Sequence, residues 1–186
     1  MYNEFIDFKS LLGEGGSGMR RRFVIEAVMV ATYGQLLVPS LPVDFVLPYS
    51  TILELYEMKD SEEPIMDDPA EDVFVRGKVA ELIQFFEDSL NRKKIERALQ
   101  VPWRESSPLI LDERIQFTVV NAVDNAHYGD YFDPVETELL LTASKLQIPL
   151  LSDQYEFQDK LIEAEVPVLV FDIEDFDYAL EEAPQL

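Results

Sequence analysis

The sequence predicts an α/β fold with a mainly parallel sheet. Three short apolar runs, at 43–48, 148–151 and 166–171, have the length of buried strands. Segments with helical spacing of apolar residues lie between these runs. Strands that alternate with helices along the chain are typical of parallel sheets, because each crossover between parallel strands needs about a helix of connecting chain.

The first predicted elements are a strand, a second strand and a helix. Residues 23–30 form a dense apolar run, in which we expect a strand in the first half; a helix reaching Leu37 is the alternative. The run at 43–48 predicts a strand ended by Pro48, and Ser50 is the expected N-cap of the next helix. That helix carries apolar residues at Ile52, Leu53, Leu55 and Tyr56.

The middle of the chain predicts an acidic loop, a long helix and a strand. Residues 60–72 are rich in Asp and Glu and contain Pro64 and Pro69, as in a solvated loop. A helix is expected over 75–99, closed by Pro102 and Trp103. Its apolar stripe is Val79, Leu82, Ile83, Phe86 and Leu90. Residues 110–121 favour a strand, with a helix as the alternative.

The segment from Asp133 to Phe157, DPVETELLLTASKLQIPLLSDQYEF, predicts a helix that leads into a buried strand. Asp133 is a suitable N-cap and Pro134 suits the first helical position. The strand at 148–151 is followed at once by Asp153. A helix over 157–165, a strand over 166–171 and an acidic helix at the end complete the prediction.

This segment resembles the C-terminal half of the PIN family of metal-dependent ribonucleases. The family pattern is an acid that opens a helix, an apolar strand and then Thr-x-Asp-x-x-Phe, for which this chain has Ser152 to Phe157. Aligned on Phe157, the family's Asp falls on Gln154, and Asp153 lies one residue earlier. The resemblance covers 19–171 apart from an insertion at about 60–130, and implies a three-layer α/β/α fold with a helical insertion.

The resemblance also implies an acidic site. Glu26 takes the place of the family's first Asp, but Ala27 and Val28 replace the polar pair that follows it, and Glu54 matches the acid of the second block. The implied catalytic residues are Glu26, Glu54, Glu136 and Asp153. The implied ligands of Mg²⁺ or Mn²⁺ are Glu54, Glu136, Asp153 and Asp133, with no organic cofactor.

Residues 1–18 have a different character from the rest of the chain. Residues 13–18, Gly-Glu-Gly-Gly-Ser-Gly, have the composition of a flexible linker, and Met19 looks like a start codon. We expect residues 1–12 to be a partner's peptide, fused through an engineered linker at 13–18 to a single domain over 19–186. An ordinary N-terminal segment with a surface loop is the alternative. The expected anchors of the peptide are Tyr2, Phe5, Ile6, Phe8, Leu11 and Leu12.

Composition restricts the partners. The formal charge of −22 opposes nonspecific binding of nucleic acid, unless the few cations gather in one place. Such a group, and the expected RNA contact, is Arg92, Lys93, Lys94 and Arg97. The chain has no Cys and a single His, which excludes disulfides and zinc sites built on Cys or several His residues. No apolar run approaches the roughly 20 residues needed to span a bilayer, so we expect a cytoplasmic protein without a membrane partner.

The leading functional hypothesis is a PIN-like domain that acts as a protein-interaction or regulatory module and binds a short hydrophobic motif. The alternative is a Mg²⁺- or Mn²⁺-dependent endoribonuclease, so the two hypotheses differ on whether the chain is an enzyme. A third reading is a nucleotide-binding or other small-molecule-binding α/β protein, although no Gly-rich phosphate loop follows a strand.

Overall fold

The structure is a computed structural model that describes residues 20–123 and 130–181. The expected peptide at 1–12, its anchors and the linker at 13–18 lie outside the described residues. Within the described ranges, no helix has both the length and the apolar character needed to cross a membrane.

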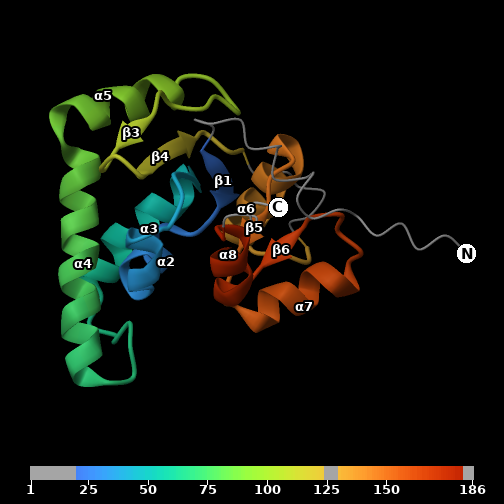
Figure 1. Cartoon of the computed structure of the whole chain (residues 1–186), viewed down its shortest axis with the longest axis horizontal. Coiled ribbons are helices and arrows are strands. Elements are labelled where there is room, and N and C mark those ends of the chain that lie inside the picture. The colour runs from blue at the N-terminus through green and yellow to red at the C-terminus, as the bar shows by residue number, and fades with distance from the viewer. Residues whose placement is uncertain (1–19, 124–129, 182–186) are drawn as a thin grey trace, which may run out of the picture.

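A six-stranded sheet forms the centre of the molecule (Figure 1). Its strands lie in the order β3-β4-β2-β1-β5-β6, and every neighbouring pair is parallel except β3 with β4. The strands are β1 (Arg21–Val24), β2 (Val43–Pro48), β3 (Leu109–Ile110), β4 (Ile115–Val120), β5 (Leu150–Leu151) and β6 (Val170–Phe171).

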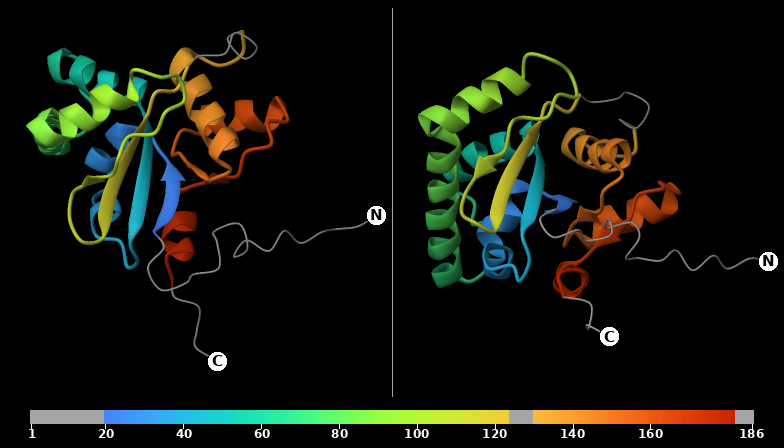
Figure 2. Two further views of the ribbon diagram at one scale, coloured as in Figure 1. Left: turned by 90° about the horizontal axis from the view of Figure 1, so that it is seen from above. Right: turned by 45° about the horizontal axis from the view of Figure 1, so that its top comes forward.

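Helices cover both faces of the sheet, as the view from above shows (Figure 2). One face carries α2 (Ala27–Thr32), α3 (Tyr49–Asp60), α4 (Pro69–Glu87), α5 (Ser89–Ala98) and α8 (Ile173–Ala179). The other face carries α6 (Pro134–Leu146) and α7 (Tyr155–Glu163). A 3₁₀ turn, η1 (Gly34–Leu37), follows α2. The predicted three-layer α/β/α architecture with a mainly parallel sheet is therefore confirmed.

The alternation of side chains along the strands divides the core in two. Phe23, Phe45 and Phe117 are fully buried and point to the face that α4 and α8 cover. Val24 and Val46, the next residue on each of the first two strands, point to the face that α6 and α7 cover. Both faces are apolar because helices lie on both, as expected for parallel strands.

The strand at 43–48 and the Asp133 cap agree with the sequence predictions, whereas two helix boundaries do not. Pro48 is the N-cap of α3 in place of Ser50, whose buried hydroxyl has no hydrogen-bond partner among the described residues. The long helix predicted over 75–99 begins earlier, at Pro69, and is two helices, because the backbone of Asp88 leaves the helical region (φ −48°, ψ 139°) and its side chain caps α5. Leu90 consequently leaves the apolar stripe and is 59% exposed.

The strand predicted over 110–121 forms as β4, an interior strand of the sheet that runs from Ile115 to Val120. β4 pairs with β2 over six residues, although it lies within the expected insertion. The helices of that range, α4 and α5, pack on the same face of the sheet as α2 and α3. The range 60–130 therefore supplies two strands of the sheet, β3 and β4, as well as helices.

Candidate functional site

The acids predicted from the sequence lie near the ends of β1 and β5, where the order of the strands reverses. The chain passes from β1 to β2 on one side, and later returns to place β5 on the other side of β1. Glu26 follows β1 by two residues and Asp153 follows β5 by two residues. In open α/β sheets, ligands bind outside the carboxyl ends of the strands at such a reversal.

Glu26 is the most enclosed carboxylate of this edge, which we call the acidic edge (Glu26, Glu54, Asp133 and Asp153). It is 7% exposed and stands at the N-cap position of α2 without capping that helix. Burial and the negative charges of Glu54, Asp153 and Asp133 raise the pKa of Glu26 to about 7. Nε2 of Gln154 donates hydrogen bonds to both carboxylate oxygens, at 2.8 and 3.0 Å. Gln154 is thus the direct partner of Glu26.

Glu54 belongs to the same electrostatic cluster. It lies on α3, the helix that begins directly after β2. Burial, and then the charges of Asp133, Glu57 and Glu138, raise the pKa of Glu54 to about 7. Glu26 and Glu54 are therefore both partly protonated near neutral pH, which shows that their surroundings do not fully compensate their charges.

Asp153 has a different partner. The hydroxyl of Tyr33 donates a hydrogen bond of 2.5 Å to Oδ2 of Asp153. Burial and this carboxylate raise the pKa of Tyr33 to about 12, so the tyrosine remains a donor at all ordinary pH values.

Glu136 is held by a cation of the protein. Nζ of Lys160, on α7, lies 2.7 Å from Oε1 and 2.8 Å from Oε2 of Glu136. Oε2 also accepts a hydrogen bond from the backbone N–H of Asp133, and Oδ1 of Asp133 accepts one from the N–H of Glu136. This capping box starts α6 and commits the Glu136 side chain to a structural role.

The predicted acids gather at one region, but they do not form a ready coordination shell. Within residues 20–123 and 130–181, no three Asp, Glu or His side chains are placed to hold a metal ion. Three of the four predicted catalytic acids, Glu26, Glu136 and Asp153, are instead bound by protein donors. A Mg²⁺ ion, which needs near-octahedral oxygen ligands, would have to displace these donors to reach the three carboxylates.

The predicted RNA contacts fall into two pairs. Arg92 and Lys93 are exposed on α5, and Nε of Arg92 lies 3.5 Å from Glu96. Lys94 and Arg97 line a pocket together with Arg104. The sequence therefore predicts the region of positive charge but not which cations share a pocket.

Sequence reasoning missed three residues that bind the predicted acids: Gln154, Lys160 and Tyr33. Register on Phe157 already placed Gln154 at the family's Asp, so its position beside Glu26 could have been inferred. Nothing in the spacing links Lys160 to Glu136, because the two are 24 residues apart on different helices. Tyr33 pairs with a residue 120 positions away and gives no local signal either.

Comparison of the sequence with protein-family models gives no matching family, and comparison with curated protein sequences gives no match.

Proposed function

We propose that this chain is a PIN-like domain that acts as a protein-interaction or regulatory module and binds a short hydrophobic peptide motif. In this proposal the acidic edge keeps its place in the fold but has lost or weakened its metal chemistry. Fold alone does not carry activity, which depends on the detailed geometry of the site.

The observation that carries this proposal is the ion pair between Lys160 and Glu136. An ammonium group and a divalent cation compete for the same carboxylate oxygens, and Lys160 contacts both oxygens of Glu136. A metal ion would have to displace this ammonium and the Asp133 N–H together. Gln154, at the family's Asp position, offers Glu26 an amide donor, where a carboxylate would offer further ligand oxygens.

The peptide-binding part of the proposal rests on the sequence of residues 1–18. A short flexible linker holds a peptide at an effective concentration in the millimolar range, so even a weak motif would stay bound to its own domain. The aromatic residues Tyr2, Phe5 and Phe8 are the type of side chain that anchors such motifs.

The test is titration of a synthetic 1–12 peptide into a protein that lacks residues 1–18. We expect saturable binding that changes little with salt, because apolar anchors dominate it, and loss of binding when Phe5 and Phe8 are replaced by Ala. A scrambled peptide of the same composition is the matched control. Absence of binding at high micromolar peptide would contradict the proposal.

A second candidate function is a Mg²⁺- or Mn²⁺-dependent endoribonuclease, favoured by the raised pKa values of Glu26 and Glu54. Four carboxylates that repel one another at a partly buried edge form a place where a divalent cation would relieve unfavourable charge. A bound metal ion would supply an activated water and stabilise the charge that develops on the scissile phosphate.

Calorimetric titration of Mn²⁺ at pH 8, where Glu26 and Glu54 are ionised, separates the two functions. The interaction module predicts no micromolar binding. The nuclease predicts micromolar binding and Mn²⁺-dependent RNA cleavage, both lost in Glu54→Gln. Glu62→Gln is the matched control, because Glu62 is exposed and its charge is not among those that raise the pKa of Glu26 or Glu54.

A further inference from the structure

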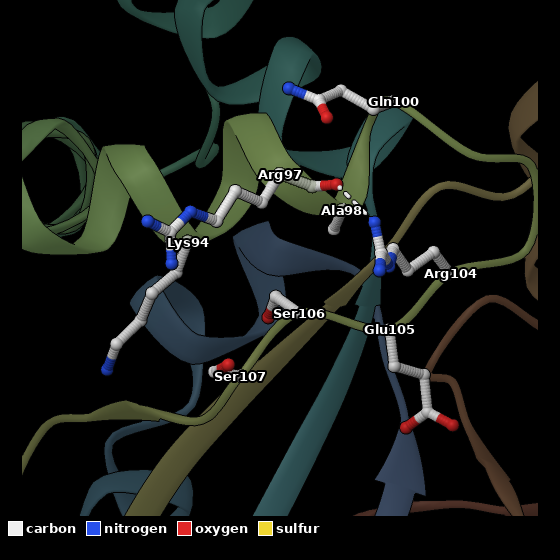
Figure 3. A pocket seen from close by; sticks show the side chains of 8 residues that line it. All are labelled: Lys94, Arg97, Ala98, Gln100, Arg104, Glu105, Ser106 and Ser107. Carbon is white, nitrogen blue, oxygen red and sulfur yellow. Dashed lines mark hydrogen bonds between the residues drawn. The ribbon is translucent and has the colours of Figure 1, made fainter.

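A second site lies away from the acidic edge, on the outer side of β4. Residues 104–107 run beside the end of β4: Glu105 forms an antiparallel bridge with Val120, and the N–H of Ser106 donates to the carbonyl of Val119. A pocket of about 440 Å³ opens between this segment and α5 (Figure 3). We call it the α5 pocket; its lining includes Lys94, Arg97, Arg104, Glu105, Ser106 and Ser107.

The cations of the α5 pocket have little to neutralise them. Within the described ranges, the Arg97 guanidinium forms no hydrogen bond or ion pair, and Arg104 reaches only the carbonyl oxygen of Arg97, at 3.4 Å. Nζ of Lys94 donates to the carbonyl oxygen of Pro108, an uncharged partner. The one acid of the lining, Glu105, forms an ion pair with Arg22 on β1.

The concentration of positive charge here is unusual for this chain. Residues 92–104 hold five of its 15 Lys and Arg residues and only one acid, Glu96, whereas the whole chain carries a formal charge of −22. Surface cations usually serve to offset neighbouring acids. The three cations Lys94, Arg97 and Arg104 line one pocket, and within the described ranges none of them pairs with a carboxylate. Together they form a local anion-attracting field.

A hydroxyl group adds a directional donor. Ser106 is 8% exposed, and its Oγ accepts a hydrogen bond of 2.9 Å from the N–H of Val119. The Ser106 O–H donates to no residue in the described ranges, so it is free to donate to a ligand. Figure 3 shows the hydroxyls of Ser106 and Ser107 between Arg104 on one side and Lys94 and Arg97 on the other.

We propose that the α5 pocket binds a phosphate group, carried by a nucleotide or by an oligonucleotide strand. Two guanidinium groups match the oxygens of a phosphate with paired donors, and a lysine ammonium and a serine hydroxyl add further donors. The volume of the pocket accommodates a group of nucleotide size. The proposal does not depend on the acidic edge or on residues 1–18.

The test is calorimetric titration of the full chain with two probes, uridine monophosphate and hexauridylate, in the presence of a chelator. Arg97→Gln and Arg104→Gln should each weaken binding at least about tenfold, the effect of losing a charge-assisted hydrogen bond. Lys93→Gln is the matched control, because Lys93, although predicted from the sequence as an RNA contact, is exposed on the same helix and does not line the pocket. We expect its affinity to stay within about twofold. Arg97 and Arg104 are exposed, and urea unfolding verifies that each variant folds.

Binding of both probes identifies a site for which one nucleotide suffices, and binding of hexauridylate alone identifies a site for a strand; both outcomes support the proposal. No binding of either probe at millimolar concentration overturns it. Equal weakening by Lys93→Gln and Arg97→Gln also overturns it, because diffuse attraction to α5 would then explain the affinity. The chelator makes these outcomes independent of a metal site, and the peptide titration tests a different segment of the chain.

Discussion

At the scale of single residues, Glu26 links the stability of the protein to pH. Its pKa of about 7 in the folded state lies above the ordinary value of 4.5. Between these values the folded protein holds a proton that the unfolded chain has released. The stabilising effect of that proton is complete below about pH 4.5 and is lost as the pH rises through 7.

We therefore predict that Glu26→Gln stabilises the protein in alkaline solution. The variant should unfold with a free energy higher than wild type by on the order of 2 kcal/mol at pH 8, and with nearly the same free energy at pH 4.5. Urea unfolding at both pH values measures this difference, with Glu62→Gln as a control on an exposed carboxylate that does not act on Glu26 or Glu54. A difference that did not change with pH would show that the charge of Glu26 is not its cause.

At the scale of elements, Asp133 at the start of α6 has two structural roles. Asp133 caps the helix through its side chain, and its charge contributes to the raised pKa values of Glu26 and Glu54. Asparagine caps helices about as well as aspartate but carries no charge, so substitution can separate the two roles.

We predict that Asp133→Asn lowers the pKa of Glu54 and of Glu26 while the stability of α6 is kept. Asp133→Ala should lower both pKa values in the same way and in addition cost about 1 kcal/mol of unfolding free energy through loss of the cap. Titration of the carboxyl carbons by NMR gives the pKa values, and urea unfolding gives the free energies. Unchanged pKa values in both variants would mean that Asp133 does not act on these acids through its charge.

Some of the helices and strands could be predicted from the sequence and others could not. The strand at 43–48 and the cap at Asp133 could be predicted because their signals, an apolar run and an Asp-Pro pair, are local. The break at Asp88 could not, because the apolar spacing continues across it while a single non-helical residue redirects the helix. In the site, the positions of Glu26 and Asp153 follow from the strands that precede them, whereas the Lys160 contact depends on how α6 and α7 pack together.

At the scale of the whole molecule, the excess of negative charge opposes the compact state. With a formal charge of −22, the folded chain brings many like charges closer together than the unfolded chain does. Salt screens this repulsion over about 10 Å at 0.1 M.

We predict that raising the concentration of sodium chloride from about 20 to about 500 mM raises the urea concentration at the midpoint of unfolding. Over this range the screening of charge changes from weak to strong. Glucose at matched osmolality is the control for effects unrelated to charge. A midpoint that falls with added salt would mean that attractive pairs, such as Arg22 with Asp44 and Arg76 with Asp72, outweigh the general repulsion.

The central position of β1 has a consequence for biosynthesis. Val24 of β1 pairs with Leu150 of β5, which is translated 126 positions later (150 − 24). Until then, this edge of β1 has no strand to pair with. At ordinary translation rates of about 5 to 20 residues per second, this delay is roughly 6 to 25 seconds. During that time one edge of the nascent sheet presents unpaired backbone groups beside an uncovered apolar face, a combination that favours association between chains. The emerging polypeptide is thus most in need of a chaperone after β4 has been made and before β5 leaves the ribosome.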